Sequence, residues 1–320
     1  MTTWEKIKAS RREQKLESKI ARMEEAGKTG MVEHPSPLGR VVDILLLLFL
    51  LCVIAVCIVP LWHVVMSSFS DGRLLLGHSG IVWWPLGGKF NLGGYKLVFQ
   101  DGSIMMGYLN TLIYVVGGTL LGLVMNIMAG YILSRNTKLR IPMTLFILFT
   151  TMFNGGTVPT YMVVRALGMT GTRWSLIIPG CTNAMFMLLM SNTFAAVDKS
   201  YVEAAEIDGA GHFDIMFKVM MPQCRGMAMV TAINTAIMRW NGWFEASIYV
   251  PTKKEYWPLQ LWVKQLTAST TEFLKQQNPD YNRYLIQYAV IVISTAPILI
   301  ALPFFIGKLE KGMVLGGVKG

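Results

Sequence analysis

Residues 41–62 read VVDILLLLFLLCVIAVCIVPLW, a run in which Asp43 is the only charged side chain. A helix needs about 20 mostly apolar residues to cross the hydrocarbon core of a bilayer. This stretch is long and apolar enough to do so. Segments of similar composition recur at about 106–133, 143–163, 175–195, 227–249 and 286–306. The sequence therefore predicts an all-α integral membrane protein with six transmembrane helices.

The composition excludes several classes of protein. Hydrophobic residues make up 53% of the chain and charged residues 15%, whereas soluble domains average about 25% charged residues. An ordinary cytosolic enzyme and a disordered chain are both excluded on this ground. The four cysteines form no CxxC pair and the four histidines no HExxH motif, so neither a disulfide framework nor a zinc hydrolase is indicated.

The net charge of +10 indicates, in so apolar a chain, the cytoplasmic face of a membrane before it indicates nucleic acid. With the N-terminus inside, the inner segments hold 18 of the 29 Lys and Arg residues and the outer loops hold 10. Both termini are thus predicted to be cytoplasmic. The predicted parts are a cytoplasmic tail (1–40), the first span with an extracellular loop (41–105), a core (106–306) containing an inner loop at 196–226, and a cytoplasmic tail (307–320).

One nucleotide-binding motif is incomplete. Gly27-Lys28-Thr29 resembles the end of a phosphate-binding loop, but that loop needs glycine at position 22, where this chain has Arg22. We therefore expect the chain to bind no ATP and no other cofactor itself.

The inner loop contains AAVDKSYVEAAEIDGAGHFDIMFKVMMPQC at 195–224. Glu203-Ala204-Ala205 is expected to open a first short helix, which Gly209 and Gly211 would break. Phe213, Phe217 and Met220, at i, i+4 and i+7, predict one apolar face on a second helix, and Pro222 would end it. Two short helices joined by a glycine turn predict a knob on the cytoplasmic surface to which a partner binds. A helical hairpin lying on the membrane surface is the alternative.

This loop resembles the EAA coupling motif of the permeases of binding-protein-dependent ABC importers. The matching residues are Glu203, Ala204, Ala205, Asp208, Gly209, Ala210 and Pro222. The chain is most similar to the second permease subunit of maltose-type carbohydrate importers, in the oligosaccharide branch. That resemblance rests on residues 91–95, 131–135, 240–244 and 316–320.

The resemblance implies a type I ABC importer permease in the bacterial cytoplasmic membrane. It implies a second permease subunit, with which this chain forms a heterodimer, two cytosolic subunits that bind ATP and Mg, and an extracellular solute-binding protein that delivers a carbohydrate. Glu203 would pair with an arginine of the ATPase. The glycine-rich end, expected to form no stable helix, would contact the ATPase dimer through Gly316, Gly317 and Lys319.

Polar residues inside the predicted spans are candidates for the substrate pathway. Asn234, Asn241 and Glu245, at i, i+7 and i+11, would fall within about 40° of one another on a continuous helix, and Arg239 and Trp243 define a second face. Two weaker candidates from other spans are Asn154 and Asn183. Hydrogen bonds between helices and an aromatic belt at the outer interface are the alternative explanation.

Two other classes of function were weighed. An ion-coupled secondary transporter would need carboxylates within the membrane, and the predicted spans offer Asp43 and Glu245, both near span ends. A membrane enzyme would need a cluster of His, Cys or carboxylate residues. The long outer loop at 250–285, with Trp257 and Trp262, is expected to contact the binding protein, and anchoring at the membrane interface is its alternative.

Overall fold

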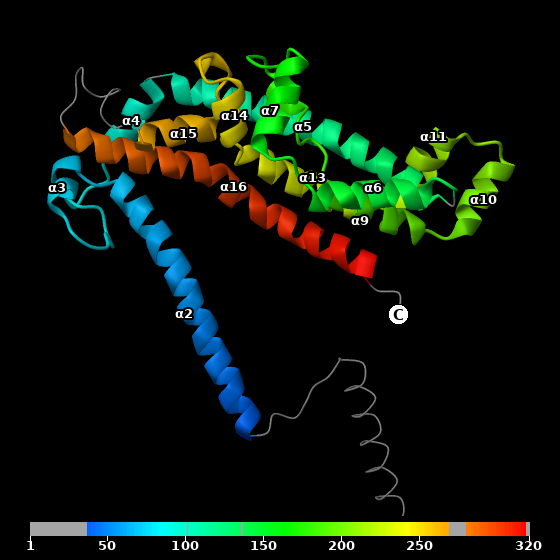
Figure 1. The fold of residues 1–320 in the computed structure, drawn as a ribbon. Helices are drawn as coiled ribbons and strands as arrows, with labels where there is room; N and C mark the ends of the chain where they lie inside the picture. Colours follow the sequence, from blue (N-terminus) through cyan, green and yellow to red (C-terminus); the bar gives the residue numbers. More distant parts are fainter. Residues whose placement is uncertain (1–36, 101, 136, 269–279, 318–320) are drawn as a thin grey trace, which may run out of the picture. The chain divides into compact units, whose positions relative to one another are not determined.

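The computed structural model describes residues 37–100, 102–135, 137–268 and 280–317. Most of the predicted tail at 1–40 lies outside them. Each regular element in these described ranges is a helix (Figure 1), which confirms the predicted all-α class. The chain divides into two units, 1–61 and 62–320, and each is described by itself.

The bounds of the helices follow the order of the chain. They are α2 (Pro37–Ser68), α3 (Gly72–Gly77), α4 (Gly93–Gln100), α5 (Ser103–Ser134), α6 (Arg140–Met152), α7 (Thr157–Ala166), α8 (Trp174–Ile177), α9 (Ala184–Ala195), α10 (Lys199–Ile207), α11 (His212–Asp214), η1 (Ile215–Met220), α12 (Met221–Gln223), α13 (Arg225–Trp240), α14 (Phe244–Tyr249), η2 (Lys254–Tyr256), α15 (Leu259–Ala268) and α16 (Asp280–Gly317).

The first unit contains the apolar part of α2. Every side chain from residue 40 to residue 58 is exposed, on all sides of the helix. Apolar side chains on all sides of a helix are unfavourable in water but favourable in hydrocarbon. An α-helix is also compatible with hydrocarbon because its backbone N–H and C=O groups bond to one another. This part of α2 is thus long and apolar enough to span a membrane, as 41–62 predicted.

In the second unit, the end of α2 and the segment after it pack as a folded structure. Ser68 Oγ lies 2.8 Å from the Tyr95 hydroxyl of α4, and the backbone N–H of Val82 donates to His63 Nδ1 at 3.0 Å. The ring of Phe69 stacks on Tyr95, with centroids 5.2 Å apart. The predicted extracellular loop therefore contains two helices, α3 and α4, fixed to the end of α2.

Helix α5 is the centre of the second unit. It lies against α9 and α13, while α16 runs along α13 (Figure 1). Small residues allow this close approach: a Cβ added to Gly122 would overlap the Cys181 carbonyl oxygen, and one added to Gly130 would lie 2.6 Å from Met190 Cγ. The glycines of α5 thus allow neighbouring segments to contact its backbone.

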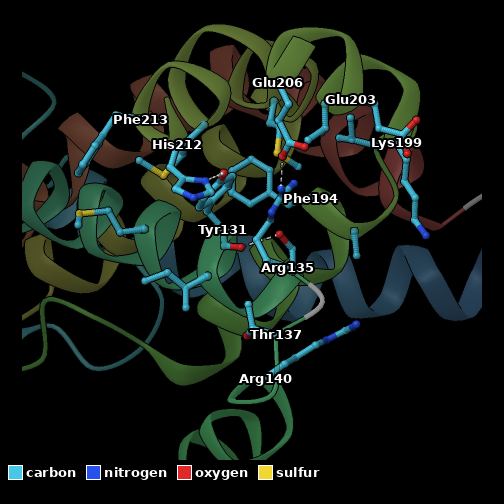
Figure 2. A pocket seen from close by; sticks show the side chains of 18 residues that line it. Tyr131, Arg135, Thr137, Arg140, Phe194, Lys199, Glu203, Glu206, His212 and Phe213 are labelled. Atoms are coloured by element: carbon cyan, nitrogen blue, oxygen red, sulfur yellow. Dashed lines mark hydrogen bonds and ion pairs between the residues drawn. The ribbon is translucent and has the colours of Figure 1, made fainter. Parts of the chain in front are cut away.

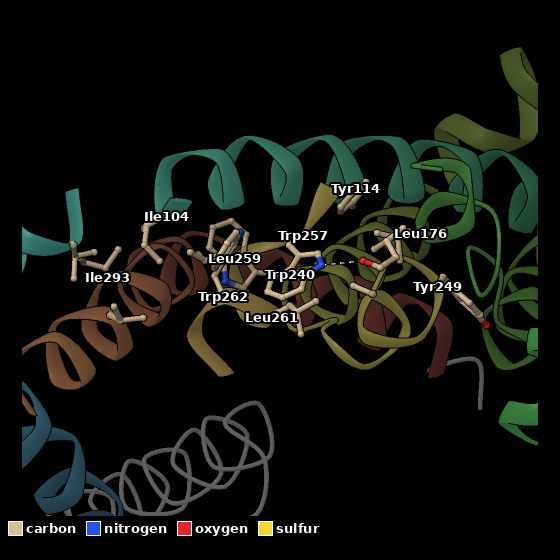
Figure 3. Close-up of a cluster of buried hydrophobic side chains, with 14 of the residues drawn as sticks. Ile104, Tyr114, Leu176, Trp240, Tyr249, Trp257, Leu259, Leu261, Trp262 and Ile293 are labelled. Carbon is tan, nitrogen blue, oxygen red and sulfur yellow. Dashed lines mark hydrogen bonds between the residues drawn. The ribbon is translucent and has the colours of Figure 1, made fainter. Parts of the chain in front are cut away.

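Two apolar clusters lie towards opposite ends of α5. The first contains Trp240, Trp257 and Trp262 and joins α5 to α13, α15 and α16 (Figure 3). The second contains Phe194 and Met220 and joins the C-terminal part of α5 to α9 and the 196–226 loop. Each cluster fixes one end of the helix to a different set of segments.

Among the described residues, three helices are long and apolar enough to span a membrane: Gly39–Ser68, Ser103–Ser134 and Tyr284–Phe305. The other three predicted spans are interrupted, so six spans stays a prediction. Helices α6 and α7 are bent by 116° at a short break. The segment 175–195 is broken between α8 and α9, and 227–249 between α13 and α14. Glycine or proline lies in each break.

Candidate functional site

The first helix of the 196–226 loop, α10, begins at a polar N-cap residue and is followed by a glycine with positive φ. The Asp198 carboxylate accepts from the Ser200 backbone N–H at 3.0 Å, which caps the N-terminus. At the other end Gly209 adopts φ +77°, and the Ala210 N–H donates to the Ala205 carbonyl at 2.9 Å. The predicted break at Gly209 is confirmed. Glu203 lies within α10, where its side chain is exposed.

The second helix differs from its predicted apolar face. Phe213 and Phe217 are 68% and 43% exposed, whereas Met216 and Met220 are both 3% exposed. The reason is the π-helical segment η1, because a π-helix winds more slowly than the 3.6 residues per turn on which the prediction rested. Pro222 does not end this helix but lies within α12, where its missing N–H is tolerated in a first turn.

Two contacts tie this loop to the end of α5, and a third, between Arg135 and Tyr131, lies within that end (Figure 2). The Arg135 guanidinium pairs with the Glu206 carboxylate at 2.6 Å and lies over the Tyr131 ring, 5.7 Å from its centroid. The Tyr131 hydroxyl is 3.1 Å from His212 Nδ1. Arg135 and Tyr131 were noted in the sequence only within the resembling stretch 131–135, and Glu206 and His212 were not singled out at all.

A cavity of about 760 Å³ lies beside these contacts, between the end of α5 and the 196–226 loop. Both apolar and charged side chains line it, among them Phe194, Arg140, Lys199 and Glu203 (Figure 2). Farther along α10, Ile207 is 86% exposed. Charged residues beside large exposed apolar ones make this region suitable for contact with another protein.

The predicted polar stripe of the fifth span extends on one helix only from Asn234 to Asn241, and its role in a substrate pathway stays a prediction. Helix α13 ends at Trp240, before Asn241, and the chain restarts as α14 at Phe244. The amides of Asn234 and Asn241 each donate to a carbonyl four residues earlier, of Val230 and Ile237. Asn241 caps α13, and its N–H donates to the Ile237 carbonyl at 3.1 Å, so the helical spacing reaches it, whereas Glu245 lies beyond the break in α14.

Asn154 and Asn183 both lie at breaks. The Asn154 side chain accepts from the Gly156 N–H at 2.9 Å, and the Asn183 side chain accepts from the Met185 N–H at 2.8 Å at the start of α9. Each amide thus stabilises the backbone where a predicted span is interrupted. A role in the substrate pathway stays a prediction for both.

Arg239 makes the most extensive set of contacts among the pathway candidates. Its guanidinium donates to the carbonyls of Leu176 at 2.9 Å, Ile177 at 3.3 Å and Pro179 at 2.8 Å. These carbonyls follow one another at the end of α8 and in the break after it. Arg239 therefore holds a broken segment against α13, which agrees with the alternative that polar residues of the spans form hydrogen bonds between segments.

The remaining candidates lie near the outer end. Trp243 is half-buried, with the Lys264 ammonium 3.2 Å from its ring centroid, while Glu245 is exposed. Trp257 and Trp262, expected to serve the outer loop as contact residues, are only 6% and 5% exposed. They belong to the first apolar cluster, and contact of the 250–285 loop with the binding protein stays a prediction.

The C-terminal tail is helical for longer than expected. Gly316 and Gly317 are the last residues of α16, so the prediction of no stable helix is wrong for these two, because α16 continues through them. Lys319 lies outside the described residues, and contact of the tail with an ATPase stays a prediction.

Residues 118–315 match the family "Binding-protein-dependent transport system inner membrane component". The chain belongs to this family. It is accordingly a multi-pass protein of the cytoplasmic membrane and a transport subunit, as the EAA resemblance predicted.

Curated relatives match the chain over nearly their whole length. Protein LplC of Bacillus subtilis is 31% identical over 292 residues, which cover 90% of this chain and 98% of the relative. The polygalacturonan/rhamnogalacturonan transport system permease protein YtcP of the same organism is 29% identical over 289 residues, covering 88% and 99%.

A solved structure matches as well. It is a chain of a bacterial ABC transporter involved in the import of the acidic polysaccharide alginate, with a TM-score of 0.79 and 27% identity over 85% of this chain and 98% of that chain. The predicted ABC importer permease fold is thereby confirmed.

Proposed function

We propose that this chain is one of two permease subunits of an ATP-driven importer of oligosaccharides. The family supports a binding-protein-dependent transport system, and both a relative and the solved structure are described as transporters of polysaccharides. The chain forms half of the translocation pathway, and a second, different permease subunit forms the other half. A solute-binding protein outside the cell delivers the sugar.

ATP hydrolysis takes place on two cytosolic partner subunits that bind ATP and Mg. The 196–226 loop, hereafter the coupling loop, contains the surface on which one of them docks, at Glu203, Ile207 and Phe213. The observation that carries this proposal is that the coupling loop presents the exposed Glu203 together with the exposed apolar side chains of Ile207 and Phe213. Closure of the ATPase dimer then moves the loop and changes the arrangement of the spans.

Reversal of the Glu203 charge tests this docking. Because Glu203 is exposed, Glu203→Lys should leave the protein folded, while it places a cation opposite the arginine expected in the ATPase. We expect at least a tenfold loss of oligosaccharide uptake and of substrate-stimulated ATPase activity in reconstituted complex. Glu203→Gln, which has nearly the same volume and no charge, should show an intermediate loss.

Equal uptake by wild-type and Glu203→Lys complexes would contradict the docking role. The substrate class is tested separately by growth of a deletion strain on a panel of glycans, followed by affinity measurements on the binding protein. Undiminished growth of the deletion strain on every oligosaccharide of the panel, with no binding of these sugars by the binding protein, would contradict the assignment to oligosaccharides.

A further inference from the structure

The end of α5 contacts both helices of the coupling loop through polar side chains. Arg135 is the residue that caps the C-terminus of α5, where a cation is favoured by the helix dipole. Its guanidinium pairs with Glu206 of α10 at 2.6 Å, and the Tyr131 hydroxyl one turn earlier lies 3.1 Å from His212 Nδ1 of α11. One turn of α5 thus contacts the loop on both sides of its glycine turn.

These two polar contacts join segments that are far apart in the sequence, because 71 residues separate Arg135 from Glu206 and 81 separate Tyr131 from His212. A second ion pair of the coupling loop is different. Lys218 and Asp214 lie 2.6 Å apart, four residues from each other on one helix, so their contact joins the loop only to itself. Both ion pairs are 2.6 Å long, but Arg135–Glu206 joins the loop to α5, whereas Asp214–Lys218 joins two residues within the loop.

Helix α5 also contacts the broken segment after α8. Gly118 lies about 17 residues, or about 25 Å, before Arg135 along the helix. A Cβ at Gly118 would lie 2.9 Å from Arg239 Nε, and Arg239 holds the carbonyls at the end of α8. One continuous helix thus connects the contacts of the coupling loop with the break in the fourth predicted segment.

We infer that Arg135 and Tyr131 are positioning residues that transmit movement of the coupling loop to α5. This inference rests on the proposed function and names the connection through which docking acts on the spans. The side chains of Arg135 and Glu206 are 28% and 46% exposed, and an ion pair this accessible contributes little to stability. Its removal should therefore weaken coupling far more than folding.

The test is a reciprocal charge exchange in the complete complex, reconstituted in proteoliposomes with its ATPase subunits and binding protein. The readout is the number of oligosaccharide molecules imported per ATP hydrolysed. We expect Arg135→Glu and Glu206→Arg each to lower this ratio at least fivefold. The double variant Arg135→Glu/Glu206→Arg should recover at least half of the wild-type ratio, because the pair is restored in reverse.

The matched control is the local pair. Asp214→Lys and Lys218→Asp, alone or together, should leave the ratio within twofold of wild type. Tyr131→Phe adds a variant that keeps the ring packed edge-on against Phe194, at a centroid distance of 6.4 Å, and removes only the hydroxyl. It should lower the ratio twofold or more with an unchanged melting temperature.

The outcomes separate this inference from the proposed function. A wild-type complex that imports no oligosaccharide on ATP hydrolysis would overturn the proposed function. If the wild-type complex does import oligosaccharide, two results would overturn only the inference. One is a wild-type ratio in both single variants, and the other is no recovery of the ratio in the double variant. An equal loss in the Asp214 and Lys218 variants would also overturn it, because the effect would then come from the charge of the loop.

Discussion

Arg239 shows how a cation is accommodated in an apolar region. A helix end leaves its last carbonyls without partners, and a guanidinium in the same region has more donors than its own helix can use. The Leu176, Ile177 and Pro179 carbonyls accept from Arg239. The cation and the broken helix therefore satisfy each other, and an acidic ligand is not needed to explain why an arginine is present.

Gly118 makes room for Arg239, and its neighbour Gly117 provides a control. A Cβ at Gly118 would lie 2.9 Å from Arg239 Nε, whereas one at Gly117 would lie 3.5 Å from Ile177 Cδ1, an ordinary contact. We expect Gly118→Ala to destabilise the protein by about 1–3 kcal/mol through overpacking. Gly117→Ala should be neutral or stabilising by up to about 1 kcal/mol, because alanine favours the helix.

Thermal unfolding of the purified complex in detergent measures both variants. The melting temperature should fall for Gly118→Ala and not for Gly117→Ala. A similar fall for both variants would contradict the specific fit of Arg239 against Gly118, and would indicate instead that any added methyl group on this part of α5 is unfavourable.

At this scale the sequence predicted some site residues and missed others. Glu203 was found because it belongs to a short motif whose residue types can be matched one by one. The Arg135–Glu206 and Arg239–Pro179 contacts join residues about 60 to 71 positions apart. Local periodicity carries no information on such pairs, since only the packing of α5 against other segments brings their side chains together.

At the scale of helices, the apolar segments were found and the breaks were not. Apolar composition is a sum over residues, and it does not change when the backbone turns between them. The break between α6 and α7 contains Asn154, Gly155 and Gly156, which are turn-forming residues. Within the coupling loop, the π-helical segment η1 changed which residues are buried, because the predicted apolar face assumed a regular α-helix throughout.

Gly156 is the residue that this break requires, since its φ is +84° and its ψ −175°, a conformation almost confined to glycine. Gly156→Ala should cost about 1–3 kcal/mol in unfolding free energy. Gly155 has no positive φ, and a Cβ there would lie 3.5 Å from Pro159 Cβ, so Gly155→Ala should cost less than about 1 kcal/mol. Chemical denaturation of the two variants measures the difference, and equal costs would contradict a backbone requirement at Gly156.

At the scale of the molecule, α5 separates two sets of contacts. Near its start Asn110 Nδ2 donates to the Glu255 carbonyl at 2.7 Å, and near its end Tyr131 contacts His212 of the coupling loop. The 21 residues between Asn110 and Tyr131 extend about 31 Å along a helix, close to the roughly 30 Å of hydrocarbon in a bilayer. The segment around Glu255 and the coupling loop should therefore lie on opposite sides of the membrane.

Labelling with a membrane-impermeant maleimide tests this arrangement and the predicted orientation together. The background replaces the exposed Cys52 and Cys57 with serine. It keeps the buried Cys181 and Cys224, because burial raises the pKa of the Cys224 thiol to about 11 and the thiolate that reacts with maleimide is then scarce at pH 7.

In intact cells whose outer surface is accessible, Lys254→Cys should be labelled and Glu203→Cys should not. In inside-out vesicles the pattern should reverse. Labelling of both positions from one side would contradict the placement of α5 across the bilayer, whereas a fully reversed pattern would place the coupling loop outside and contradict its contact with a cytosolic ATPase.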